Sequence, residues 1–354
     1  MSAHKLNTAG SLALHVNIGL ILTSVLVLAI PFVGSGVDVW SALREGPFAE
    51  QPSPSGMIFW QTRLPRVLAA LGSGAALAMA GVAFQAILRN PLAEPYILGI
   101  SGGAALGKAV VLLLAGGVQG ALIGMTNGGA FLGALAPVLI LHGLRRRRRH
   151  WSSETVLLAG VVMNVLASAL LLLIQFFSDF TLVRQMFAWT LGGLDIVGYQ
   201  PLVVLWPAVI LGGVILTWLG RALNVLALGT MMATHLGVNV HRVVAGAVWL
   251  GALLTATSVA VAGPIGFVGL LVPHILRAFV GSDHRRLIPL SAIYGGLFLL
   301  VCDFLGWRGL ELFALAGVFH GHPSEIPVGI ITACVGGIFF LWLLFRREDN
   351  ECDL

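Results

Sequence analysis

Charged residues are scarce in this chain. Asp, Glu, Lys and Arg together supply only 10% of its 354 residues, and 58% of the residues are hydrophobic. A soluble domain is about 25% charged, because its surface has to face water. The composition therefore excludes an ordinary soluble protein and indicates a membrane protein.

Cysteines and long polar loops are also nearly absent. The three cysteines, Cys302, Cys334 and Cys352, are far apart and form no C-x-x-C pair. This spacing indicates neither a disulfide framework nor a zinc site. No loop is long enough for a soluble catalytic domain, which takes at least about 50 residues. We expect no catalytic residue, metal or cofactor, and we place the activity within the bilayer.

Ten apolar runs approach the length that crosses a membrane, about 20 residues for ~30 Å of hydrocarbon. Lipid offers no water to backbone groups, so such runs form helices, whereas barrel strands would alternate in polarity and be about half as long. The expected fold is all-α, a single polytopic domain over residues 1–354. Its ten predicted spans are Leu12–Val33, Leu64–Leu88, Ile97–Leu114, Ala121–Leu141, Thr155–Phe177, Pro201–Leu219, Val243–Ala262, Ile265–Val280, Leu287–Leu305 and Pro327–Phe345.

The basic residues predict the orientation of these spans. Fourteen of the 20 Lys and Arg residues, including the run Arg145–Arg149, fall on the side of the N-terminus. Cytoplasmic loops of membrane proteins are enriched in Lys and Arg, so both termini are expected in the cytoplasm. This bias, with contact to anionic lipid, explains the net charge of +5 better than nucleic-acid binding does.

Residues Gly102–Ala109 nearly spell the phosphate-binding loop G-x-x-x-x-G-K-[ST]. Ala109 replaces the hydroxyl that would bind magnesium, and no soluble strand precedes the stretch, so we reject nucleotide binding. Close helix packing explains its glycines. It does not explain Lys108, because a charge inside a span is by default a functional-site hypothesis. Lys108 either faces a translocation pathway or reaches a water-filled cavity.

Gly99-Ile100-Ser101-Gly102 has the form of an intramembrane serine protease nucleophile, with His142 or His274 as a base elsewhere. A nucleophile needs its base within hydrogen-bond reach, which a sequence does not show. A helix start just after Pro95 explains the stretch more simply, and the protease remains an unfavoured alternative.

The stretch QAILRNPLAEPYILGISGG, residues 85–103, is predicted to be a cytoplasmic turn between the second and third spans. Asn90-Pro91 ends one helix, because the residue before a proline avoids the α conformation. Pro95 fits the first turn of the next helix.

Several stretches, in order along nearly the whole chain, carry a family resemblance. They are RLPRVLAALGSGAALAMAGVAFQA (63–86), RNPLAEPYILGISGG (89–103), LLAG (157–160), VAGPIGFVGLLVPHILR (261–277), DHRRLIPLSA (283–292) and EIPVGIITACVGGIFFLWLL (325–344). Together they resemble the FecCD-type permeases of bacterial ABC importers for iron–siderophores, haem and cobalamin.

This resemblance implies a ten-helix subunit of the bacterial inner membrane that pairs with a second copy of itself. It also implies two cytoplasmic ATPase subunits and a periplasmic or lipid-anchored substrate-binding protein as partners. Substrate would cross by alternating access. From the residues alone, a secondary transporter or channel remains open, with Lys108 and Asp303 as ion-coupling charges.

The segment between the sixth and seventh spans, residues 221–242, includes a short predicted helix over Thr230–Leu236 that ends at Gly237. In the family this position resembles the coupling helix that fits a groove of the ATPase. The expected coupling residues are Met231, Met232, Thr234, His235, Leu236 and Gly237.

The resemblance also implies a cytoplasmic gate formed by Asn90 and Leu92 with Ser152, Ser153 and Glu154. Ser152 or Ser153 equally fits a helix N-cap, and both roles can coexist. Gly72, Gly74 and Gly81 are candidates for a pathway lined by small residues.

At the opposite side of the membrane, Arg63 and Arg66 resemble the arginines with which the family meets a glutamate on each lobe of the binding protein. Alternatively, they anchor a helix at the lipid headgroups. Residues 303–325 are longer than usual for the family and displace its next outer arginine, for which Arg308 is the nearest candidate. The insertion contains His320 and His322, which fit an ordinary polar loop better than a haem or metal contact.

Overall fold

The computed structural model describes residues 9–33, 38–46, 53–115, 123–147, 153–315 and 325–351. Within these ranges the chain is helical and contains no strand, in agreement with the all-α prediction. Seven helices are long and apolar enough to cross a membrane. They are α1 (Ala9–Ala29), α4 (Leu64–Leu88), α6 (Ile123–Arg147), α7 (Ser153–Phe177), α9 (Gln200–Ala227), α11 (Val240–Ala262) and α13 (His284–Leu315).

Three helices with shorter apolar stretches occupy the third, eighth and tenth predicted spans: α5 (Ile100–Leu114), α12 (Val268–Val280) and α14 (Val328–Glu351), whose apolar part ends at Leu343. The 13 residues of α12 rise only about 20 Å, less than the ~30 Å of a bilayer core. The prediction began this span at Ile265, whereas the helix begins at Val268. Gly263 and Phe267, both with a φ of +68°, interrupt the helix before that point.

The remaining helices are short: η1 (Ile30–Phe32), α2 (Val39–Glu45), α3 (Pro54–Met57), η2 (Ile58–Arg63), η3 (Pro95–Leu98), α8 (Phe180–Thr190) and α10 (Thr230–His235). Of these, the sequence analysis expected only α10. Local capping explains α8, because the Asp179 carboxylate accepts a hydrogen bond from the Leu182 backbone N–H at 2.8 Å. A search for runs of membrane-spanning length overlooks helices of this size.

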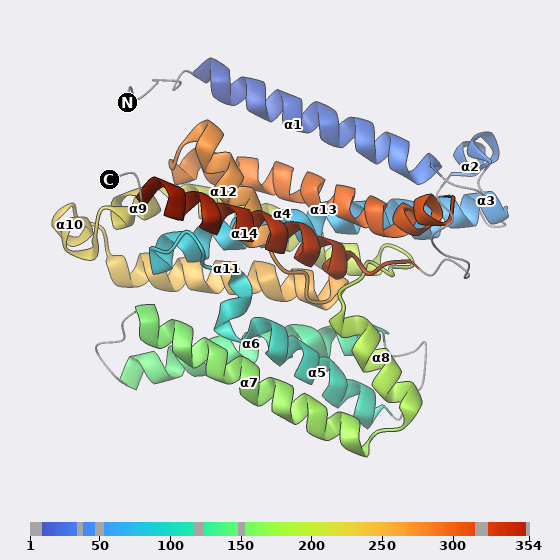
Figure 1. Ribbon diagram of the computed structural model, residues 1–354, viewed down its shortest axis with the longest axis horizontal. Helices are drawn as coiled ribbons and strands as arrows, with labels where there is room; N and C mark the ends of the chain where they lie inside the picture. Colours follow the sequence, from blue (N-terminus) through green and yellow to red (C-terminus); the bar gives the residue numbers. More distant parts are fainter. Residues whose placement is uncertain are drawn as a thin grey trace.

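The long helices lie roughly side by side, with α4 and α13 in the middle (Figure 1). Helices α5 to α8 form a group along one side, and α1 lies along the opposite edge. Helix α10 projects at one end of the molecule, which we call the α10 end. The first residues of α1 and the last of α14 lie at this same end, whereas α2 and α3 lie at the other, the α3 end (Figure 1).

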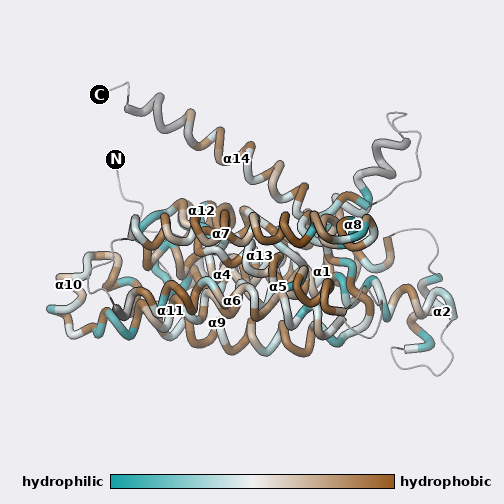
Figure 2. The backbone as a smooth tube through the Cα atoms, turned by 90° about the horizontal axis from the view of Figure 1, so that it is seen from below, coloured by the Kyte–Doolittle hydropathy of each residue, from teal (hydrophilic) through white to brown (hydrophobic). Residues whose placement is uncertain are grey.

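Burial differs sharply between the central and peripheral helices. In the most apolar part of α4, 94% of the residues are buried, against 11% in α1 and in α7. Helix α4 is rich in Ala and Gly, and a Cβ on its Gly74 would collide with the Gly295 backbone of α13. Apolar residues remain along the outer helices, as Figure 2 shows. This arrangement fits a protein in lipid, where small residues bring helices together and large apolar ones face outward.

Candidate functional site

The turn between α4 and α5 lies where the sequence predicted it. Helix α4 ends at Leu88, and Arg89 follows with a φ of +50°. The Asn90 side-chain oxygen accepts a hydrogen bond from the Leu92 backbone N–H at 2.9 Å, which tightens the turn. Pro95 begins η3 rather than the next span, because Gly99, with a φ of +85°, separates η3 from α5.

Polar side chains attach this turn to two neighbouring elements. The Glu94 carboxylate accepts a hydrogen bond from the Phe267 backbone N–H just before α12, and the Tyr96 hydroxyl accepts one from Ile265 N–H at 2.9 Å. The Asn164 amide of α7 donates to the Tyr96 carbonyl at 3.0 Å. The sequence analysis missed these residues, although polar side chains in apolar surroundings usually have partners.

Of the predicted gate residues, Asn90 and Leu92 lie in this turn. Ser153 and Glu154 open α7, as expected of residues just before an apolar run. Ser152 lies outside the described residues, as do the side chains of Ser153 and Glu154. The gate therefore stays a prediction.

The predicted coupling helix is present as α10, and Gly237 follows it with a φ of +79°. Ala233 is buried, so the helix rests on the bundle by one residue of its inner face. Its outer side exposes large apolar side chains, with Met231 77%, Met232 53% and Leu236 59% accessible. Thr234 and His235 are exposed beside them. An exposed apolar patch at the end of a bundle is typical of an interaction surface.

A cavity of about 820 Å³ opens at the α3 end. Charged side chains of both signs line it, from η2, α4, α8, α13 and the segments that precede α9 and α14. They are Arg63, Arg66, Arg184, Asp195, Asp303 and Glu325.

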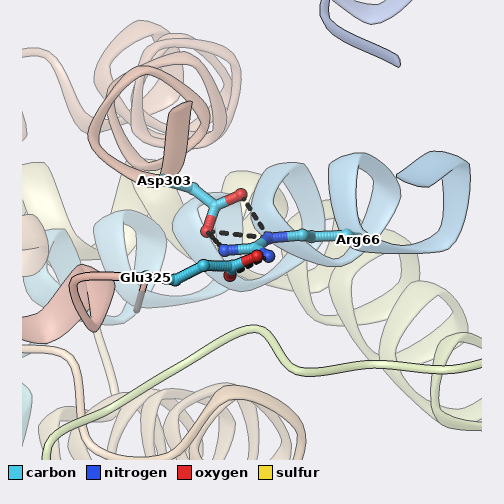
Figure 3. Close-up of polar contacts among 3 residues, drawn as sticks. All are labelled: Arg66, Asp303 and Glu325. Carbon is cyan, nitrogen blue, oxygen red and sulfur yellow. Dashed lines mark hydrogen bonds and ion pairs between the residues drawn. The ribbon is translucent and has the colours of Figure 1, made fainter. Parts of the chain in front are cut away.

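Arg66 holds two carboxylates in this cavity (Figure 3). Its Nε donates to Asp303 Oδ2 at 2.9 Å and its Nη2 to Asp303 Oδ1 at 2.9 Å, a two-point contact that suits the planar guanidinium. Its Nη1 donates to Glu325 Oε2 at 2.5 Å. We call these three residues the Arg66 clamp. It joins α4 to α13 and to the start of α14.

The other two predicted docking arginines share one aromatic ring. The Arg63 guanidinium lies 5.0 Å from the centre of the Trp307 ring, and that of Arg308 lies 5.1 Å from it. Arg63 Nη1 also donates to the Pro31 carbonyl at 3.0 Å. The three predicted docking residues are thus brought together at one end, each with contacts inside the chain. His320 and His322 lie outside the described residues.

The predicted pathway residues lie elsewhere. Gly72, Gly74 and Gly81 are buried in α4, facing Leu205, Gly295 and Gly269, so close helix packing explains them. Lys108 places its Nζ 4.7 Å from the centre of the Trp189 ring, a cation–π contact between α5 and α8.

The glycines of the P-loop-like stretch also serve packing, since Gly103 and Gly107 face Gly133 and Gly129 of α6. Among the described residues no group of three or more His, Cys, Asp or Glu side chains is placed to hold a metal ion. Asp303, a candidate ion-coupling charge, is engaged by Arg66.

Comparison with known proteins agrees with this architecture. The FecCD transport family matches residues 18–346. The vitamin B12 import system permease protein BtuC of Klebsiella pneumoniae is 40% identical over 315 residues, covering 86% of this chain and 87% of its own. The hemin transport system permease protein HmuU of Yersinia pestis is 39% identical over 296 residues, covering 83% and 85%.

A solved structure of an ABC transporter also resembles this chain over most of its length. It is described as an inward-facing conformation of a metal-chelate type ABC transporter, and it superposes with a TM-score of 0.79 at 28% sequence identity. The superposition covers 94% of this chain and 99% of the other.

Proposed function

Because this chain belongs to the FecCD transport family, we propose that it is the membrane permease subunit of an ABC importer for a bulky chelate, an iron–siderophore, haem or cobalamin. The observation that carries the proposal is the match over residues 18–346, with relatives at about 40% identity named for vitamin B12 and hemin transport. The chain is a transport subunit rather than an enzyme, in keeping with relatives that are named as permease proteins.

The proposed assembly contains two copies of this chain, two ATPase subunits and an external substrate-binding protein. The exposed methionines of α10 support an ATPase contact, because apolar side chains at the end of a membrane bundle need a covering partner. The arginines at the α3 end support a contact with carboxylates of the binding protein. With α10 in the cytoplasm, both termini lie there too.

Transport in proteoliposomes tests the energy source. The permease with its ATPase and binding protein is expected to import the chelate only when ATP is supplied on the ATPase side. A preparation of the permease alone that moved chelate down an ion gradient would instead establish a secondary transporter. A catalytically dead ATPase is the matched control.

The cargo follows from the binding protein of the same system. Absorption spectroscopy of that protein, purified with its ligand, distinguishes haem, corrinoid and ferric siderophore. A small free ion such as nickel in its site would contradict the proposed bulky chelate.

The orientation has its own test. Single-cysteine labelling with a membrane-impermeant maleimide is expected to reach position 231 only from the cytoplasmic side and position 40 only from the outside. The reverse pattern would contradict the proposed topology.

A further inference from the structure

The two carboxylates of the Arg66 clamp are held in different ways. Asp303 lies within α13, makes the two-point contact, and its side chain is only 6% exposed. Glu325 makes a single contact to Nη1, and its side chain is 44% exposed. In Figure 3, Asp303 and Glu325 approach the guanidinium from different elements. Asp303 is therefore a fixed partner, and Glu325 is the one that water or another molecule can reach.

The charge within the Arg66 clamp itself also favours release of Glu325. One guanidinium faces two carboxylates, so one negative charge in the clamp is not compensated by Arg66. Asp195 adds a third carboxylate to the same cavity, and Arg63 and Arg184 add two further positive charges to its lining. Ion pairs that water can reach are weak, and the Glu325 side chain is 44% exposed, so a competing carboxylate can replace it at little cost.

Glu325 is joined to a segment that leads into α14. Two backbone hydrogen bonds hold this segment: Ile326 N–H donates to the Gly306 carbonyl at 3.1 Å, and Gly329 N–H donates to the Gly192 carbonyl at 3.2 Å. Beyond them α14 diverges from the bundle (Figure 2). Its side chains Ile338 and Phe345 are 70% and 65% exposed. Release of Glu325 would therefore remove a side-chain attachment just before this helix, while Val328 and Thr332 at its start stay buried.

We propose that the Nη1 position of Arg66 is an exchangeable carboxylate site. A glutamate of the docking protein takes the place of Glu325 there, while Asp303 stays bound. Docking then frees the segment that leads into α14, and so couples an event outside the membrane to a helix within it. This inference rests on the proposed docking of a substrate-binding protein at the α3 end.

The test compares two single-charge removals in the same cavity. Glu325→Gln removes the carboxylate that competes for Nη1 of Arg66. Asp195→Asn is the control, because Asp195 is exposed in the same cavity and makes no hydrogen bond or ion pair with Arg66 within the described part of the chain. Both are prepared in the full transporter in nanodiscs. Affinity for the purified substrate-binding protein of the same system is measured from 0.05 to 1 M salt.

At low salt both variants should bind more tightly, because both remove a charge that repels an acidic partner. At 1 M salt, where the screening length is about 3 Å, the gain from Asp195→Asn should vanish. Glu325→Gln should still bind about tenfold more tightly, because competition at a contact does not depend on long-range attraction. A Glu→Gln change in the binding protein's docking residue should abolish that remaining gain.

Equal behaviour of the two variants at every salt concentration, or weaker binding by Glu325→Gln, would overturn the exchange. Failure of the wild-type transporter to bind the protein at all is a different result, since it would refute the proposed docking itself. Both variants keep the contact between Arg66 and Asp303. Their unfolding temperatures, compared with that of the wild type, check that each variant is folded.

Discussion

The candidate binding residues at the two ends of the molecule differ in whether they already have contacts within the chain. At the α3 end, Arg63, Arg66 and Arg308 already have partners within the chain, on the Trp307 ring or in the Arg66 clamp. At the α10 end, Met231, Met232 and Leu236 are mostly exposed. With the proposed partners at the two ends, the α3 end would have to give up internal contacts on binding, whereas the α10 end would bind without rearrangement.

The largest effect is expected from breaking the clamp at its buried pair. Arg66→Met leaves the Asp303 carboxylate buried without its counter-charge, and loss of one member of a buried pair costs about 3–5 kcal/mol. We expect a corresponding fall in the free energy of unfolding, measured by denaturant titration in detergent. Arg66→Met with Asp303→Leu, which removes both charges, should recover most of it. Equal stability of the single and double variants would show that the clamp contributes no buried ionic contact.

Substitutions at the α10 end should weaken binding to the ATPase subunit without changing the free energy of unfolding. Met231→Ser combined with Met232→Ser removes exposed apolar surface, so unfolding should change by less than about 0.5 kcal/mol. Binding to the ATPase subunit should weaken tenfold or more, about 1.4 kcal/mol. Trp40→Ser is the matched control, because Trp40 is 73% exposed at the α3 end. ATPase binding as tight as that of the wild type would refute the coupling role of α10.

Lys108 is expected to have an intermediate effect: it lies in the bundle, and its contact within the described part of the chain is with the Trp189 ring. Lys108→Met should lower stability by about 0.5–2 kcal/mol through loss of the cation–π contact. Lys108→Arg should retain most of it. A double-mutant cycle with Trp189→Leu measures the pair alone, and a coupling energy of zero would mean that the contact contributes nothing.

The smallest effect is expected at Asp283, between α12 and α13. Burial would raise the pKa of its carboxyl, but hydrogen bonds from Asn224 and the Arg285 backbone, together with nearby arginine charges, lower that pKa overall. A lowered folded-state pKa stabilises the fold above the ordinary Asp value of about 4 and loses that contribution as pH falls through the lowered value. The carboxylate is 38% exposed, so the effect should stay below about 1 kcal/mol.

Unfolding temperatures of wild type and Asp283→Asn should therefore converge as the pH falls below the ordinary Asp value of about 4. A gap between them that persists or widens in acid would contradict the assignment.

Local sequence patterns predicted most of the helices, but they did not predict contacts between residues far apart in the chain. Gly237 marks the end of α10 within a residue or two, whereas Pro95 begins η3 and α5 starts only at Ile100. The partners of Arg66, in contrast, are 237 and 259 residues away, and only folding brings them together. The intramembrane charge of Asp303 could have indicated a pair, because lone charges are expensive in lipid. Nothing local identified which arginine it meets.

The backbone of the segment after Glu325 tests the exchange most directly. Hydrogen–deuterium exchange of a peptide covering residues 325–330 is compared in the full transporter with and without its substrate-binding protein. Exchange should become faster on docking, because release of Glu325 loosens the bonds from Ile326 N–H to Gly306 and from Gly329 N–H to Gly192. Unchanged or slower exchange in this peptide, with docking confirmed in the same sample, would contradict the proposed carboxylate exchange at Arg66.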